Sequence, residues 1–217
     1  VLKPIGESGA IRSNETRAIA CAGTGLAMAI LPSLKNGPRV VPSEGGHVRI
    51  ATVDASEREL VDAAEQELGL KTITWEHFLS GPGLVNLYRA VAALWGTKPV
   101  LLGPKEISAL GLSVSDPVCH RTLATFCGFF GTAWGSLALT AHALGGIYVG
   151  GTVVAAVAPM LDESRFRRRF VNVGIQADIL QSVPTVLFNQ DSLGVQGAAD
   201  YATVALSSDG QTGPGFR

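Results

Sequence analysis

A glutamate and a histidine three residues apart are the side chains of this sequence best suited to hold a polyhydroxylated ligand. Glu44 and His47 flank two glycines in the run SEGGH, and glycines allow a sharp turn that brings the two side chains together. A carboxylate accepts hydrogen bonds from neighbouring hydroxyls, while an imidazole donates or accepts them. The pair therefore suits a sugar diol. A turn that carries an exposed ion pair is the alternative.

Two glycine-rich turns have the composition to approach a nucleotide. Gly23-Thr24-Gly25 follows an apolar run, and its backbone N–H groups and hydroxyl could cradle a phosphate. Gly145-Gly146 and Gly150-Gly151 flank a short apolar run, so a flat ring such as adenine could lie against the backbone there. A plain hairpin turn and a tightly packed core strand are the respective alternatives.

Glu76 is a third candidate, although alone it is typical of a surface charge before the turn Gly81-Pro82-Gly83.

The elements that must position these residues follow from apolar periodicity and turn signals. Extended segments are predicted at 17–22, 26–31, 39–41, 48–51, 72–75, 147–149 and 184–188. Helices are predicted at 56–68, 84–94, 116–143 and 194–205, with a further helical stretch after 151.

Two of these helices have clear N-terminal signals. Ser56, with Glu59 three residues later, predicts a capping box, and Asp116 is expected to cap the long helix. Small residues in that helix predict close packing against a neighbour: Gly128, Gly131, Ala133, Gly135 and Ser136. The order of elements indicates an α/β fold, a mixed sheet with helices on its faces.

Composition narrows the functional classes. Seventeen basic and eighteen acidic residues give a net charge of -1, which argues against a nucleic-acid partner. The basic run 165–169 is interpreted as a solvated helix face above buried Phe166 and Phe170. No uninterrupted apolar run of membrane-spanning length occurs, so no membrane span is expected. Three cysteines without metal-ligand spacing predict reduced thiols in the cytoplasm and no protein metal site.

Five motifs occur in one order along the chain: GTGL (23–26), SEGGH (43–47), LSGPGLVNLYRA (79–90), GGIYVGG (145–151) and LFNQDSLGVQGAA (187–199). Together they resemble the bacterial glucokinase family of the hexokinase-like ATPase superfamily, from near Val1 to about Ala205. Two positions depart from the family pattern: Ala27 replaces a glycine, and Leu193-Gly194 replaces a proline-glycine turn. Neither change removes a polar group.

The resemblance implies a ribonuclease-H-like (actin/hexokinase-type) fold and phosphorylation of glucose or a related hexose by ATP with Mg²⁺. It implies that Gly23, Thr24 and Gly25 face the ATP phosphates, with Gly25 also beside the sugar. Glu44, His47 and Glu76 would hold glucose hydroxyls. The adenosine segment would comprise Gly145, Gly146, Gly150 and Gly151. A cytoplasmic homodimer is also implied.

Residues 1–206 correspond to the large lobe of such an enzyme, with 207–217 expected to form a flexible tail. The family's first phosphate loop and its catalytic aspartate in an Asn-Asp-Phe context are not found, so the general base is expected upstream of Val1. This chain alone is therefore expected to be weakly active. Two alternatives stay open: a non-catalytic sugar-binding domain of a kinase-related regulator, and a kinase for mannose or an N-acetylamino sugar.

Overall fold

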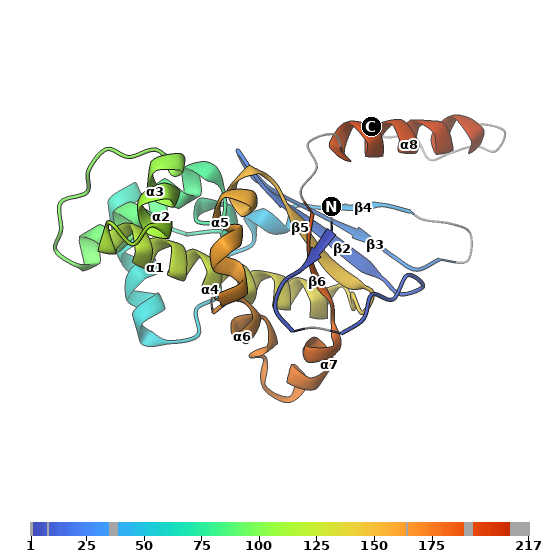
Figure 1. The fold of residues 1–217 in the computed structure, drawn as a ribbon, viewed down its shortest axis with the longest axis horizontal. Helices are drawn as coiled ribbons and strands as arrows, with labels where there is room; N and C mark the ends of the chain where they lie inside the picture. The colour runs from blue at the N-terminus through green and yellow to red at the C-terminus, as the bar shows by residue number, and fades with distance from the viewer. Residues whose placement is uncertain (1, 8, 35–38, 164, 189–192, 209–217) are drawn as a thin grey trace. The chain divides into compact units, whose positions relative to one another are not determined.

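The computed structural model describes residues 2–7, 9–34, 39–163, 165–188 and 193–208. They contain a six-stranded sheet in the order β1-β6-β5-β2-β3-β4 (Figure 1). Its strands are β1 (Leu2–Pro4), β2 (Arg17–Ala22), β3 (Leu26–Leu31), β4 (Val41–Ser43), β5 (Gly146–Gly150) and β6 (Thr185–Phe188). The neighbours β2, β5 and β6 pair in parallel, and the other pairs are antiparallel. The predicted mixed sheet is confirmed.

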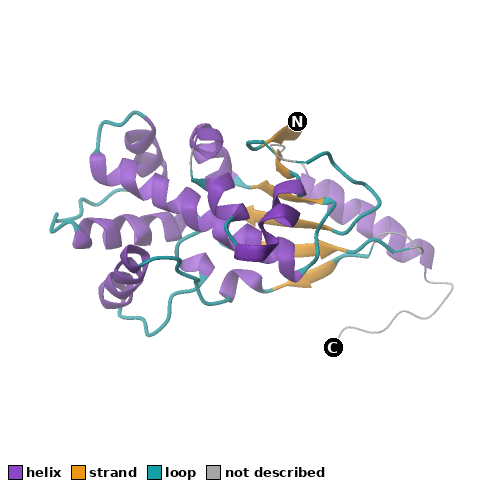
Figure 2. Cartoon of the chain, turned by 90° about the horizontal axis from the view of Figure 1, so that it is seen from below, coloured by secondary structure: helices purple, strands orange, loops and turns teal. Residues whose placement is uncertain are grey.

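Seven α-helices accompany this sheet within residues 2–188, where most of them gather to one side of the strands (Figure 2). They are α1 (Ala55–Leu68), α2 (Gly81–Leu94), α3 (Pro104–Leu112), α4 (Pro117–Thr140), α5 (Thr152–Glu163), α6 (Phe166–Val171) and α7 (Ala177–Ser182). Helix α8 (Leu193–Ser208) belongs to a separate compact unit. Most of the expected tail, residues 209–217, lies outside the described residues.

The long helix α4 is the centre of the hydrophobic core. Its buried Phe130 lies 4.8 Å from Trp134 and 5.8 Å from Phe166 of α6, measured between ring centroids. Phe170 of α6 is also fully buried, so the predicted burial of Phe166 and Phe170 is confirmed. The solvated face predicted above them is only partly present, because Arg165 and Arg168 are exposed but the Arg169 side chain is 10% exposed. By length and composition α4 could cross a membrane, but 72% of its most apolar window is buried inside the molecule, as in a core helix.

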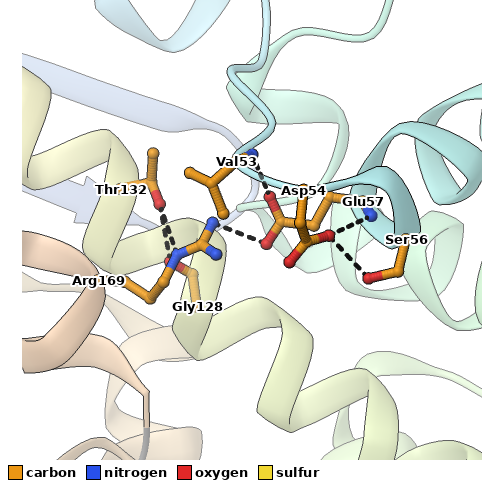
Figure 3. A network of polar contacts seen from close by, with 7 residues as sticks. All are labelled: Val53, Asp54, Ser56, Glu57, Gly128, Thr132 and Arg169. Atoms are coloured by element: carbon orange, nitrogen blue, oxygen red, sulfur yellow. Dashed lines mark hydrogen bonds and ion pairs between the residues drawn. The ribbon is translucent and has the colours of Figure 1, made fainter. Parts of the chain in front are cut away.

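Helix α1 begins at a different cap from the one predicted. Asp54, and not Ser56, is the N-cap, because its carboxylate accepts a hydrogen bond from the Glu57 N–H at 2.9 Å (Figure 3). Glu57 returns a bond by accepting from the Val53 N–H at 3.0 Å. The Glu57 N–H holds the pKa of Asp54 below its usual range. The sequence signal was shifted by two residues because Asp54 and Ser56 are both good capping residues.

Other differences arise where pairing is long-range. The segments predicted as strands at 48–51 and 72–75 contain only one isolated bridge among the described residues, between Arg49 and Thr74. The second segment runs into a short 3₁₀ turn, η2 (Trp75–His77). Strand β1 and helix α3 were not predicted. Because β1 has three residues and pairs only with β6, no local periodicity could identify it.

Val114 occupies a position that favours glycine. The Ser115 N–H reaches the Leu110 carbonyl at 3.1 Å and the Val114 N–H reaches the Gly111 carbonyl at 3.3 Å, which is the hydrogen-bond pattern of a Schellman motif. The φ angle of Val114 is 56°, in the left-handed region that a β-branched side chain rarely adopts. The side chain is exposed and has little packing to lose.

Val114→Gly is therefore expected to raise the free energy of unfolding by roughly 0.5 to 1 kcal/mol, because relief of the strain exceeds the added backbone entropy. Urea denaturation of the parent and the variant measures the difference in unfolding free energy. Gly69→Ala is the reverse substitution at a comparable position. Gly69 ends α1 at φ 64° with open space around it, so alanine there should destabilise the protein by about 1 kcal/mol. A lower stability of Val114→Gly would contradict the argument.

Candidate functional site

The candidate site lies at the carboxyl ends of the parallel strands β2 and β5. Cys21 pairs with Gly150 in the parallel register, so the turns that follow the two strands emerge at the same edge of the sheet. Ligands of open α/β sheets bind at this edge. An open cavity of about 650 Å³ is found there, lined by Cys21, Gly23, Thr24, Gly25, Leu26, Ala27, Glu44, His47, Glu76, Gly151 and Thr152.

The carboxylate of Glu76 is fixed to the turn between β2 and β3. Its Oε2 accepts a hydrogen bond from the Leu26 N–H at 2.8 Å, across fifty residues of sequence. Glu76 sits in the turn η2, whose ends are joined because the Thr74 N–H donates to His77 Nδ1 at 3.0 Å. Glu76 is therefore a partly buried side chain with a defined direction, and not a free surface charge.

Glu44 and His47 stand at the mouth of the same cavity. Glu44 precedes the short 3₁₀ turn η1 (Gly45–His47) and His47 ends it, with His47 Nε2 3.8 Å from Glu44 Oε2. Their side chains are 93% and 60% exposed for Glu44 and His47, so both are open to a ligand. A Cβ on Gly46 would lie 2.4 Å from the Leu26 carbonyl oxygen, so this glycine lets η1 approach β3. Glu44, His47 and Glu76 therefore line the same cavity.

The N-terminus of α2 connects Glu76 to the Gly23–Gly25 turn. Ser80 caps the helix by accepting from the Gly83 N–H at 3.0 Å, and its hydroxyl donates to the Glu76 carbonyl at 2.9 Å. The next residue, Gly81, donates its N–H to the Gly23 carbonyl at 2.7 Å. From the sequence, the helix was expected to begin at residue 84, with Ser80 in the preceding loop. Serine directly before Gly81-Pro82 was the available signal, because serine is a preferred N-cap and proline is favoured in the first turn of a helix.

The four glycines around β5 do not form one surface. Gly150 and Gly151 end the strand beside the candidate site, and Gly151 lines the cavity. Gly145 and Gly146 lie at the other end of the strand, about 13 Å away at the usual rise per residue. A Cβ on Gly145 would lie 2.7 Å from the carbonyl oxygens of Arg12 and Glu15. Close packing against backbone accounts for the glycine at position 145.

Helix α5 points its N-terminus at the cavity. It begins at Thr152, directly after Gly151, whose φ of 101° turns the chain from strand to helix. A Cβ on Gly151 would approach the Ala22 carbonyl oxygen to 2.3 Å, so only glycine fits between β2 and β5 here. The first N–H groups of a helix lack intrahelical partners and carry partial positive charge. With the exposed Thr24, this edge offers donors suited to phosphate.

The side chains of the site do not form a metal cage. Within the described part of the chain, no group of three or more His, Cys, Asp or Glu side chains could hold a metal ion. Cys21 lines the cavity, but burial raises the pKa of its thiol, so it is not an activated nucleophile. The site is therefore built from backbone donors, two carboxylates and an imidazole.

A second cavity of about 220 Å³ lies among α1, α2, α4 and α6, away from these turns. Its wall includes Glu57 and Arg169, which are paired with each other at 2.7 Å. Asp54, also in the wall, is bonded to the N-terminus of α1. Because Glu57 and Arg169 pair between two helices, Asp54 caps α1, and the cavity lies away from the glycine turns, we assign it to the packing of the helices.

Comparison with known proteins identifies the fold and its relatives. A sequence profile of the family described as Glucokinase matches residues 4–205. The curated glucokinase of Saccharophagus degradans is 37% identical over 195 residues, which cover 90% of this chain and 60% of that protein. The chain spans 55–60% of the length of the curated relatives it matches.

Solved structures of glucokinases are also similar to this chain. The glucokinase from an Antarctic psychrotroph has a TM-score of 0.83 and 34% identity, covering 90% of this chain and 61% of its own. The glucokinase from Balamuthia mandrillaris in complex with glucose also has a TM-score of 0.83, with 93% of this chain and 59% of its own covered. At 22% identity that second likeness concerns the fold alone. Together they bear out the ribonuclease-H-like, hexokinase-type fold class.

Proposed function

The chain belongs to the glucokinase family, and from that premise we propose that it builds the sugar site and part of the nucleotide site of an enzyme that phosphorylates glucose with ATP. The observation that carries the proposal is the shared cavity. Glu44, His47 and Glu76 line it together with the Gly23–Gly25 turn, although the segments are far apart in sequence. Sugar and phosphate sites must adjoin in a kinase, because the hydroxyl has to meet the phosphorus in line.

Each polar group in the cavity has a binding role in this proposal. The Glu76 carboxylate accepts hydrogen bonds from sugar hydroxyls, with its direction set by the Leu26 N–H. Glu44 accepts from a neighbouring hydroxyl, and His47 donates or accepts beside it. Their exposure leaves them free to close on the sugar as it enters. A neutral sugar ring is thus held by polar groups from two turns.

The nucleotide phosphates are proposed to lie along the turn after β2 and the N-terminus of α5. Thr24 offers its hydroxyl, and the first turn of α5 offers N–H groups and the helix dipole. Of the glycines around β5, Gly150 and Gly151 are at this edge and are retained for the nucleotide. Gly145 and Gly146, at the opposite end of β5, are given no part in nucleotide binding in this proposal.

Mg²⁺ is compatible with this arrangement without a protein cage. The ion usually keeps several waters and is held by one or two carboxylates plus substrate phosphates. When bound with ATP it would neutralise phosphate charge. Both carboxylates of the cavity, Glu44 and Glu76, are assigned to the sugar, so the ion would be held chiefly by the phosphates and water.

The direct test is Glu76→Gln. Glucose affinity is expected to fall roughly 10- to 100-fold, the usual cost of losing a charge-assisted hydrogen bond. Isothermal titration of the full chain with glucose measures the dissociation constant. Glu67→Gln on α1, in an exposed ion pair with Arg89, is the matched charge control and should bind as the parent does. Equal affinity of Glu76→Gln and the parent would remove Glu76 from the sugar site.

A homodimer and a cytoplasmic location are part of the proposal. The location is supported by the low number of cysteines in the sequence, three, which do not have the spacing of a metal site. The homodimer rests on the family resemblance. Light scattering on the full chain measures its mass in solution, and a monomer at micromolar concentration would contradict the dimer.

A further inference from the structure

We infer that Gly25 is a positioning residue that decides which oxygen of Glu76 faces the sugar. The inference rests on the proposed function, in which Glu76 is a sugar ligand. It goes further by assigning a steric role to the glycine and a directing role to the adjacent backbone N–H of Leu26. Together they hold Oε2 against the backbone and leave Oε1 as the oxygen without a hydrogen bond from the described residues.

The two carboxylate oxygens of Glu76 have different surroundings. Oε2 accepts the hydrogen bond from the Leu26 N–H at 2.8 Å. No described residue donates a hydrogen bond to Oε1. Glu76 also lines the cavity. The oxygen that the protein leaves unbonded is thus the one available to a hydroxyl of the ligand.

The approach of Oε2 to Leu26 requires the absence of a side chain at Gly25. A Cβ built there would lie 2.9 Å from Glu76 Oε2 and 3.6 Å from Cδ, with no other heavy atom within 4 Å. Gly25 is not among the glycines with positive φ, so its backbone does not require glycine. Among the described residues, the Glu76 carboxylate is the group that the missing side chain at Gly25 leaves room for.

The backbone of Glu76 cannot retreat to make room. Its carbonyl is held by the Ser80 hydroxyl at 2.9 Å, and the preceding Trp75 is 4% exposed. The capping box between Thr74 and His77 closes the turn on both sides of Glu76. A Cβ at position 25 would therefore push the carboxylate itself, break the bond to Leu26 and change the direction of Oε1.

The test is a double-mutant cycle of Gly25→Ala and Glu76→Ala, with glucose affinity measured without nucleotide by calorimetry or ligand-observed NMR on the full chain. Gly25→Ala is expected to weaken glucose binding at least tenfold in the parent. In the Glu76→Ala background the same substitution should change affinity less than twofold, because its only neighbour is gone. Equal effects in both backgrounds would overturn the inference.

Gly23→Ala is the comparison in the same turn. Its Cβ would have one heavy atom within 4 Å, Thr152 Oγ1 at 3.8 Å and not Glu76, and its φ is also not positive. Whatever its effect on glucose affinity, that effect should be the same within twofold in the parent and in the Glu76→Ala background. If the effect of Gly23→Ala also disappears when Glu76 is removed, the coupling belongs to the turn as a whole and the inference fails.

Three other outcomes of these experiments distinguish the inference from the proposed function. If Gly25→Ala does not fold, the added Glu76→Ala substitution should restore the thermal transition, and failure to restore it would show that the clash lies elsewhere. If the parent chain does not bind glucose, the proposed function fails. If the parent binds glucose and Gly25→Ala binds it equally well, the proposed function stands and this inference alone is wrong.

Discussion

Gly131→Ala is expected to lower the free energy of unfolding by about 3 kcal/mol, the upper range for overpacking a core. A Cβ at this position on α4 would lie 2.2 Å from the Phe166 carbonyl oxygen and 3.0 Å from Arg169 Cβ. These atoms belong to α6, which cannot move away because Phe166 and Phe170 are fully buried in the core beneath it. Urea denaturation followed by circular dichroism measures the loss.

Gly128→Ala, one turn earlier on the same helix, separates crowding from helix propensity. No heavy atom lies within 4 Å of its added Cβ, so alanine adds only helix preference at that site. We expect it to stabilise the protein by roughly 0.5 to 1 kcal/mol. The two substitutions are identical in chemistry and should have opposite signs. A loss of stability in both would show that α4 and α6 do not pack as closely as the structure indicates.

These glycines illustrate what local sequence could predict in the helical region. A long helix capped by Asp116 with small residues for close packing was predicted, and the cap is confirmed by its bond to the Cys119 N–H at 2.7 Å. Close packing is confirmed at Gly131 and Gly135 but wrong for Gly128. The identity of the partner could not be predicted, because α6 is about thirty residues further along and short. A glycine in a helix predicts close packing but does not indicate which element packs against it.

For the sheet, the positions of the strands could be predicted from the sequence, but their pairing could not. β2, β3 and the turn between them were predicted because an apolar run, a glycine turn and a second apolar run describe a hairpin locally. β5 and β6 were predicted as short apolar runs. The parallel pairing of β2 with β5 joins residues 129 positions apart, and that of β5 with β6 joins residues 38 positions apart. Periodicity carries no information at that range.

At the candidate site, the turns were predicted and their convergence came from the resemblance. The bond between the Leu26 N–H and Glu76 had no sequence signal, because a backbone donor is present at every residue except proline. The separation of Gly145 from Gly151, by contrast, could have been predicted, since a five-residue strand must hold its ends apart. The sugar and nucleotide roles of these residues stay predictions until binding is measured.

Glu57→Gln tests the buried ion pair that joins α1 to α6 and is expected to cost about 3 kcal/mol of unfolding free energy. Arg169 Nη2 lies 2.7 Å from Glu57 Oε1, and the two side chains are only 10% and 13% exposed (Figure 3). Arg169 Nη2 makes no hydrogen bond among the described residues, so the attraction is chiefly ionic. Glutamine keeps an oxygen for the Val53 N–H and turns its NH₂ group towards Arg169, so the guanidinium loses its counter-charge.

The loss arises mainly on the arginine, because its charge would stay buried without a counter-ion. Arg169 would keep a bond from Nε to the Thr132 hydroxyl at 3.1 Å, which does not neutralise it. Replacing both residues, as Glu57→Gln with Arg169→Met, removes that uncompensated charge and should recover at least half of the lost stability. Chemical denaturation of the four proteins of this cycle measures both quantities.

The exposed pair Glu67–Arg89 provides the matched control. Its atoms are 2.6 Å apart, as close as in the buried pair, but the side chains are 32% and 43% exposed for Glu67 and Arg89. Water and salt screen such a pair, so Glu67→Gln should cost no more than about 1 kcal/mol. Because distance is matched and burial differs, the ratio of the two losses isolates burial as the cause. Equal losses would mean that the Glu57–Arg169 pair is no more sheltered than a surface contact.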